Sequence, residues 1–182
     1  MVTIRHERPP DIAAREALLD RCFGPTRSDK PSQRLRDGRR PAPGLAFVAV
    51  AHGRIVGTVR LWNVSAGPSR PALLLGPLAV DPPWRGRRIG AALMRRALAE
   101  GARLGHGAVL LVGDAAYYGR FGFAAARAAA LHLPGNDAPE RLLGLELVPQ
   151  ALAGATGAIR APAPAQAAGR THRRGADLPQ AA

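Results

Sequence analysis

Cysteine, aromatic residues and lysine are scarce in this chain of 182 residues. Its one cysteine excludes a disulfide framework and a zinc cluster built on cysteines, and the five histidines lack the spacing of a metal site. No apolar run reaches the roughly 18 residues that a membrane span needs. The N-terminus carries charge within its first five residues and lacks the apolar stretch of a signal peptide. We therefore expect a cytoplasmic protein that uses no metal and no membrane.

Negative charge is also in short supply. The chain has 26 basic residues against 13 acidic ones, a formal charge of +13, and every basic residue except Lys30 is an arginine. Such an excess attracts anions, either nucleic acid or a phosphorylated small ligand. A solvated basic surface explains it equally well, because arginine and alanine both have GC-rich codons. Nucleic acid is the less favoured partner, since aromatic residues that could stack on bases make up only 4% of the chain.

The chain does have enough apolar sequence for one folded domain. Hydrophobic residues make up 47% of it, as in an ordinary globular protein. The domain is expected to span residues 1–150, and residues 151–182, rich in Ala, Gly, Pro and Arg, are expected to form a disordered tail. The apolar patterns predict helices over residues 12–23 and 89–104, and strands over residues 2–6, 45–51, 55–64, 72–80, 108–112 and 140–148.

The order of these elements predicts an α/β fold with a mixed central sheet. A strand, a helix and a strand over residues 72–112 are typical of a βαβ unit, whose strands are parallel. Residues 45–64 instead predict an antiparallel hairpin. Residues 24–44 have little to bury and are expected to form a mobile loop over or beside a site. The arginines of this loop are interpreted as solvated, with an acidic ligand as the alternative; they include Arg34, Arg36, Arg39 and Arg40.

A proline interrupts the strand predicted over residues 72–80. Proline cannot donate a hydrogen bond to a neighbouring strand, so it does not suit a central strand. A bulge at Gly76–Pro77 resolves the conflict and splays this strand from the next one. Main-chain groups of Leu78, Ala79 and Val80 would then be free to pair with an extended ligand. An edge strand is the alternative, but the run is apolar on both faces and favours the bulge.

A basic turn with glycines follows this strand and leads into the predicted helix over residues 89–104. N–H groups in the first turn of a helix lack partners within the helix and attract anions. Glycine allows a ligand to approach closely, and arginine donates well to phosphate. The turn therefore predicts a phosphate or pyrophosphate site, although it matches neither the Walker loop nor the dinucleotide fingerprint. A surface turn with solvated arginines is the alternative. The residues expected to bind are Arg85, Gly86, Arg87, Arg88, Ile89, Gly90 and Ala91.

Two motifs, the second of which begins about 30 residues after the first, resemble motifs of the GNAT N-acetyltransferase superfamily. Residues 85–90, RGRRIG, resemble the family's cofactor motif, Gln/Arg-x-x-Gly-x-Gly/Ala. Residues 118–123, YGRFGF, resemble its later pattern, Tyr-x-x-x-Gly-Phe. Residues 113–118 and 140–143 are similar to a bacterial branch often called YhbS-like. The resemblance covers residues 2–149.

This resemblance implies a GNAT-like acyl-CoA N-acyltransferase fold with acetyl-CoA, or another acyl-CoA, as co-substrate and no metal. The pyrophosphate would bind the N–H groups of residues 86–91, and the pantetheine arm would pair with Leu78 and Val80. An amine of a small molecule, a peptide or a protein would attack the acyl group directly. Tyr118 matches the general acid that protonates the CoA thiolate, and Asp114 is a candidate for the general base.

Two departures from the family pattern matter. Arg88 stands where the motif has glycine, so its side chain would crowd the pyrophosphate, turn away or clamp the phosphate. The strand predicted over residues 72–80 has no acidic residue, and Asp81 is interpreted as part of a turn. These departures keep open a non-catalytic acyl-CoA sensor or docking protein, ahead of a nucleic-acid-binding protein. The sequence does not distinguish a monomer from a homodimer.

Overall fold

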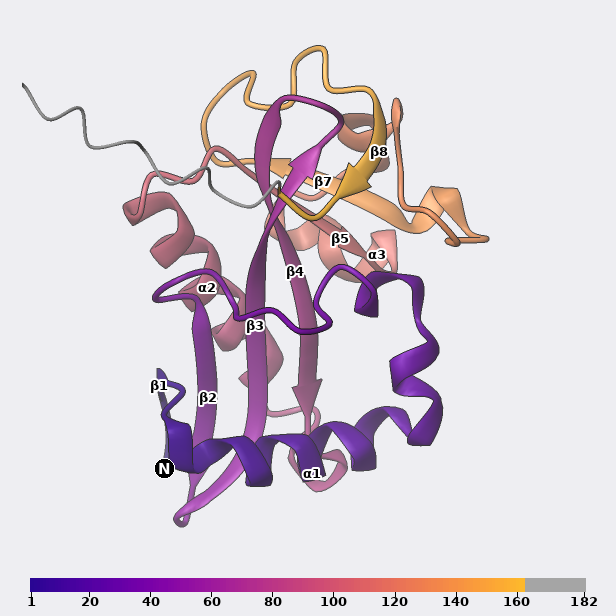
Figure 1. The fold of residues 1–182 in the computed structure, drawn as a ribbon. Coiled ribbons are helices and arrows are strands. Elements are labelled where there is room, and N and C mark those ends of the chain that lie inside the picture. Colours follow the sequence, from indigo (N-terminus) through magenta and orange to yellow (C-terminus); the bar gives the residue numbers. More distant parts are fainter. Residues whose placement is uncertain (163–182) are drawn as a thin grey trace, which may run out of the picture.

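A mixed β-sheet with helices on both faces forms the centre of the molecule (Figure 1). The computed structural model describes residues 1–162. Two short strands, β6 (Leu131–His132) and β8 (Gly157–Arg160), pair with each other, and β8 also pairs with β3. The α/β class and the mixed sheet are as predicted. The other strands are, in spatial order, β1 (Val2–His6), β2 (Ala46–Ala51), β3 (Arg54–Ala66), β4 (Arg70–Val80), β5 (Ala108–Val112) and β7 (Leu142–Glu146).

Two helices cover opposite faces of the sheet. α1 (Ile12–Phe23) and α2 (Ile89–Arg103) each bury an apolar stripe, as the sequence periodicity predicts. Val48 of β2 packs with the buried leucines of α1, whereas its neighbour Phe47 packs with the buried apolar side chains of α2. Successive side chains of a strand point to opposite faces, which explains the difference. No helix in the described part of the chain is long and apolar enough to cross a membrane.

The strand that contains the proline is bulged and splayed, as predicted. β3 has one residue between Val59 and Leu61, and β4 has two, Gly76 and Pro77, between their partners Leu78 and Leu75. The Trp62 indole fixes this bulge by donating to the Gly76 carbonyl, 2.6 Å away. β4 pairs with β5 only through Leu73–Val109 and Leu74–Leu110, both before the bulge. Beyond Leu74 the edge of β4 is therefore unpaired on the β5 side.

The basic segment over residues 24–44 lies beside this opening. It contains short 3₁₀ turns at Pro25–Asp29 and Pro31–Gln33 and, as expected, no long helix or strand. Arg39 ties it to the sheet, because its guanidinium donates to the carbonyls of Leu35 and Asn63 at 2.8 Å each. The segment thus forms a wall beside the unpaired edge.

The expected domain boundary after residue 150 differs from the structure. Leu152, Ala155 and Ile159 are buried, and β8 adds to the end of β3 opposite Ser65 and Ala66. The low content of bulky residues made this stretch resemble a tail, yet one isoleucine and main-chain pairing are enough to dock it. The part of the predicted tail over residues 163–182 lies outside the described residues.

Candidate active site

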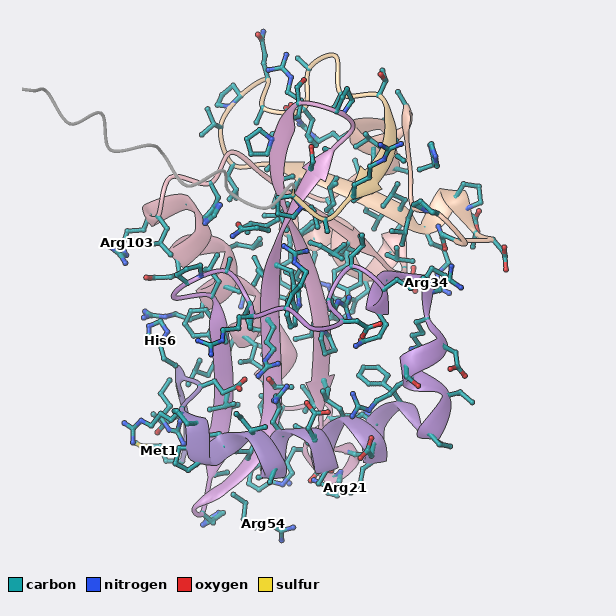
Figure 2. All side chains as sticks on the ribbon, viewed as in Figure 1. Met1, His6, Arg21, Arg34, Arg54 and Arg103 are labelled. Atoms are coloured by element: carbon teal, nitrogen blue, oxygen red, sulfur yellow. The ribbon has the colours of Figure 1, made fainter. Side chains whose placement is uncertain are left out.

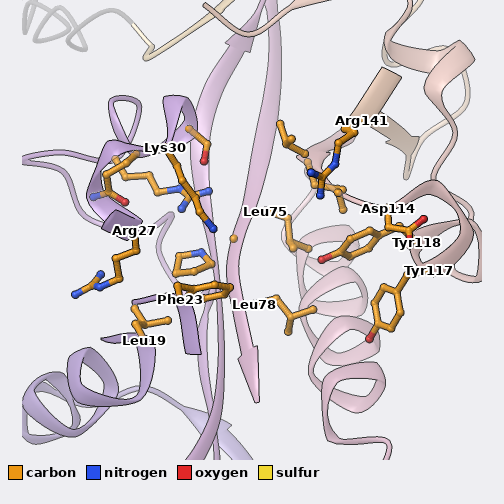
Figure 3. A pocket seen from close by; sticks show the side chains of 18 residues that line it. Leu19, Phe23, Arg27, Lys30, Leu75, Leu78, Asp114, Tyr117, Tyr118 and Arg141 are labelled. Atoms are coloured by element: carbon orange, nitrogen blue, oxygen red, sulfur yellow. The ribbon is translucent and has the colours of Figure 1, made fainter. Parts of the chain in front are cut away.

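Two cavities meet at the unpaired edge of β4. The α2 cavity, about 440 Å³, lies between the basic turn, the start of α2 and the two tyrosines of α3 (Ala115–Tyr118). The α1 cavity, about 380 Å³, lies between the end of α1, the 24–44 segment and the end of β5 (Figure 3). Leu78, Tyr117 and Tyr118 line both cavities. A ligand in one would therefore reach a ligand in the other across these side chains.

The structure brings together most of the predicted anion-binding residues. Gly86 and Arg88 adopt positive φ angles of 76° and 60°, and Arg88 is the N-cap of α2. Arg88 is exposed and lines the α2 cavity from this position. N–H groups of the first turn of α2 have no acceptor within the helix. The predicted residues that line the α2 cavity are Leu78, Val80, Arg85, Gly86, Arg88, Ile89, Gly90 and Ala91.

Two predicted residues lie elsewhere. Ala79 is buried with the leucines of α1 on the other face of β4. The Arg87 guanidinium stacks on the Trp84 ring, 4.9 Å from its centroid, and does not line the α2 cavity. The Val80 carbonyl, which we expected to be free, accepts from Arg85 Nε at 3.3 Å and from Cys22 Sγ at 3.4 Å. The Arg85 side chain folds back onto the end of β4, and this hydrogen bond occupies the Val80 carbonyl.

A single helical turn after β5 carries the two tyrosines into the site. Its N-cap is Asp114, whose Oδ1 accepts from the Ala116 N–H at 2.8 Å. The tyrosine rings pack edge to face with centroids 4.9 Å apart. The Tyr118 ring lies directly on Gly113, where a Cβ would overlap it. The Tyr117 hydroxyl lies against Gly90, 3.2 Å from where a Cβ would be.

The environment of Tyr118 keeps its hydroxyl protonated at neutral pH. Burial is the main cause that raises the pKa of this phenol above 10, and Tyr117 adds to it while Arg141 opposes it. A neutral phenol can donate a proton or a hydrogen bond to a ligand at the junction of the cavities. Asp114 is exposed and lines the α1 cavity, with one carboxylate oxygen engaged in capping.

Several residues of the site were not among those predicted. Gly113, Arg141 and Lys30 line the α1 cavity, and Arg36, interpreted from sequence as solvated, lines it too. Burial lowers the pKa of Arg36 to about 10. Gly113 and Arg141 lie in the two segments that resemble the YhbS-like branch, although neither was assigned to the site. No sequence motif marks Lys30 or Arg36, because the cavity joins segments far apart in the chain.

Comparison with known proteins decides the family. A model of the acetyltransferase (GNAT) family matches residues 12–123. The chain is also 32% identical to "Uncharacterized N-acetyltransferase YhbS" of Escherichia coli over 161 residues, which cover 86% of this chain and 93% of that protein. The chain belongs to the GNAT acetyltransferase family. The sequence resemblance is thereby confirmed.

Solved structures of GNAT proteins agree with this assignment. E. coli YhbS in complex with CoA superposes with a TM-score of 0.75 and 31% identity, covering 88% of this chain and 89% of that one. A GNAT acetyltransferase from Brucella melitensis in complex with acetyl-CoA gives a TM-score of 0.64 and 28% identity, covering 82% and 90%. The GNAT fold predicted from two motifs is therefore the fold of this chain.

Proposed function

We propose that this GNAT protein transfers an acetyl group from acetyl-CoA to an amine. The observation that carries the proposal is the junction of the two cavities at Tyr118. The α2 cavity offers helix N–H groups and arginines to a pyrophosphate, and the unpaired edge of β4 offers main-chain groups to an extended arm. Two solved relatives were crystallised with CoA or acetyl-CoA, which supports the same ligand here.

Each part of the site then has a role. Acetyl-CoA supplies the activated acyl carbon. The first turn of α2, with Arg85 and Arg88, holds the pyrophosphate, while Leu78 guides the arm toward the α1 cavity. The amine in the α1 cavity attacks the acyl carbon, a C–N bond forms and the C–S bond breaks. Tyr118 donates its hydroxyl proton to the departing sulfur, and the proton released by the amine returns to the phenolate through solvent.

Removal of the first amine proton is assigned to Asp114. It is the acidic residue among those that line the α1 cavity, and one of its oxygens is engaged with the Ala116 N–H. This engagement and the exposed arginine at position 88 favour a second candidate function, an acyl-CoA-binding protein without catalysis. The two candidates share the ligand and differ in turnover.

Calorimetric titration of acetyl-CoA at physiological salt tests the shared ligand. We expect micromolar binding that ATP, a matched polyphosphate, does not equal. Gly90→Glu places a carboxylate beside the Tyr117 hydroxyl and at the first turn of α2, so it should abolish binding. Equal binding of ATP and acetyl-CoA would show an unspecific anion site and would contradict both candidates.

Replacement of Tyr118 distinguishes the acetyltransferase from the non-catalytic acyl-CoA-binding protein. Tyr118→Phe should lower kcat by about 10²–10³ with a KM for acetyl-CoA within about threefold, because the hydroxyl acts on the leaving sulfur. Tyr117→Phe keeps an aromatic ring beside the same cavities and should lose less. Release of CoA is followed with a thiol reagent and a panel of amines. No release above hydrolysis with any amine would favour the non-catalytic protein.

A further inference from the structure

Side chains that end in nitrogen are spread over the whole fold (Figure 2), and a group of basic ones lines the α1 cavity (Figure 3). Four basic side chains line it: Arg27, Lys30, Arg36 and Arg141. Arg27 forms ion pairs with Glu16 and Asp20 of α1 and is neutralised by them. Within residues 1–162, no carboxylate lies within ion-pair distance of the other three. The cavity therefore has cations to spare for a ligand.

Arg36 is the most informative of them. Its Nε is enclosed by protein and has no hydrogen-bond partner among the described residues. The adjacent Asp37 forms no ion pair with it: its carboxylate accepts from Gln33 Nε2 at 2.8 Å, and its negative charge offsets only part of the effect of burial on the pKa of Arg36. The tip of the guanidinium lies next to the bulge, 3.0 Å from where a Cβ of Gly76 would be. The charge of Arg36 is therefore partly removed from water without an ion-pair partner, and an anion bound at the tip of the guanidinium, where Arg36 lines the cavity, would offset this cost.

Lys30 lines the same cavity as Arg36, and both belong to the segment over residues 24–44. Its ammonium lies 4.6 Å from the centroid of the Phe23 ring, an attractive contact that positions it over the cavity. The tyrosines and Asp114 lie on the opposite wall, where the acyl group would arrive (Figure 3). The wall with Lys30 is thus suited to an anion, and the opposite wall carries Asp114, a carboxylate that suits an amine, together with Arg141 (Figure 3).

We propose that the acceptor is a small amine that also carries an oxyanion, a carboxylate or a phosphate, bound by Arg36 and Lys30. The planar guanidinium of Arg36 suits two-point binding of such a group, and the anion would direct the amine toward Tyr118. A cavity of about 380 Å³ accommodates a molecule of this size. This proposal rests on the proposed acetyl transfer and adds the chemical class of the acceptor.

Matched acceptors test the anion directly. Rates of CoA release are compared for 3-aminopropanoate and its amide, 4-aminobutanoate and its amide, and 2-aminoethyl phosphate and ethanolamine. We expect kcat/KM to be at least about 100-fold higher for the anionic member of a pair. The carboxylate pairs and the phosphate pair distinguish the two oxyanions. Equal rates for anionic and neutral members would overturn the proposal.

Variants test which side chains cause the preference for anionic acceptors. Arg36→Gln should reduce the preference for the anionic member at least tenfold through a higher KM, with the rate for the neutral amide within about threefold. Lys30→Gln removes an exposed charge and should reduce the preference in the same direction. Arg34→Gln is the control, because Arg34 belongs to the same segment, is exposed and does not line the cavity. An equal loss for anion and amide in Arg36→Gln would show a structural role only.

Binding without turnover keeps this proposal separate from catalysis. Calorimetric titration of 3-aminopropanoate and of 2-aminoethyl phosphate, with CoA present, should show binding of at least one of them that Arg36→Gln abolishes. If anion binding is lost in the variant while no amine is acetylated, the site stands and the acetyl transfer fails. If acetyl-CoA is turned over with amines but neither anion binds or reacts preferentially, the acceptor class fails and the acetyl transfer stands.

Discussion

Gly113 determines where the Tyr118 ring can lie. The absence of a side chain at position 113 allows this ring to pack on the end of β5. Gly113→Ala should displace the ring, lower kcat at least tenfold and leave acetyl-CoA binding within about threefold, because the basic turn and the first turn of α2, which would hold the pyrophosphate, are left unchanged. Steady-state kinetics combined with calorimetry measures this split.

Gly119→Ala is the matched control for that variant. A Cβ at Gly119 meets nothing within 4 Å, and its φ of −55° suits alanine. We expect unchanged kinetics in this variant. If Gly113→Ala behaved like Gly119→Ala, the position of the Tyr118 ring would not matter for the reaction.

Among single residues, the sequence predicted those that belong to local motifs. Tyr118 and all residues of the turn over 85–91 except Arg87 line the α2 cavity. Arg36 and Gly113 could not be predicted in their roles, since each depends on a neighbour from another element. The fold also placed Arg87 and Ala79 away from the α2 cavity for reasons that no motif contains.

Asp11 connects two elements, β1 and α1. Its carboxylate accepts two hydrogen bonds from Arg5, at 2.6 and 2.8 Å, and one from the Arg8 N–H at 2.7 Å. The Arg5 guanidinium is the main cause that lowers the pKa of Asp11 to about 2. Because the folded pKa is below the unfolded one, the pair stabilises the protein above about pH 4 and loses this effect as the pH falls toward 2.

Asp11→Asn should therefore cost about 1–2 kcal/mol of unfolding free energy at pH 7, discounted for the partial exposure of the pair. The difference from the unsubstituted protein should shrink as the pH falls from 4 to 2. Urea titrations at pH 7, 4 and 2.5 measure it. A difference that is independent of pH would assign the effect to packing rather than to charge.

β8 is an element that the sequence did not predict. Ile159 is completely buried and packs with Trp62, Val64 and Leu74, which belong to β3 and β4. Ile159→Ala should destabilise the protein by about 2–4 kcal/mol, whereas the exposed neighbour in Arg160→Ala should change stability by less than about 0.5 kcal/mol. Chemical denaturation compares them. Equal stability of both variants would mean that residues 157–160 behave as the tail we first expected.

Several elements were predicted with their exact bounds. These are α1, β1 and β5: β5 is an almost completely buried apolar run, whereas β1 has no buried residue and pairs with β2 along its whole length. β3 and β4 extend further than predicted, to Ala66 and from Arg70, because pairing between the two strands continues past the apolar residues. β8 has little apolar character and depends on pairing with β3 and β6, so its own sequence carries no periodic pattern.

At the scale of the whole molecule, part of the excess positive charge is concentrated at one place, the α1 cavity. The formal charge of +13 did not by itself identify a partner. Acidic side chains such as Glu7, Asp11 and Glu146 are engaged with arginines in the fold. The α1 cavity is where unpaired cations face an enclosed space. The positions of the arginines in the fold therefore point to a ligand site, whereas their number in the sequence does not.

Acyl-CoA binding should also stabilise the whole molecule. A ligand at 100 times its Kd adds about 2.7 kcal/mol to the free energy of unfolding. For a domain of this size that corresponds to a Tm about 5–10 °C higher. Differential scanning fluorimetry with acetyl-CoA, and with ATP at the same concentration, measures the shift. Gly90→Glu should show none, and an equal shift with ATP would contradict a specific site.

The short seam between β4 and β5 has a consequence for the lifetime of the protein in a cell. Two residue pairs join these strands, so the half of the sheet with β5 and β7 is attached to the other half by few main-chain hydrogen bonds. We expect this seam to open locally before the rest of the fold when no ligand fills it. Proteases that act on the opened state would then remove the unliganded protein faster, so its abundance would follow the supply of acyl-CoA.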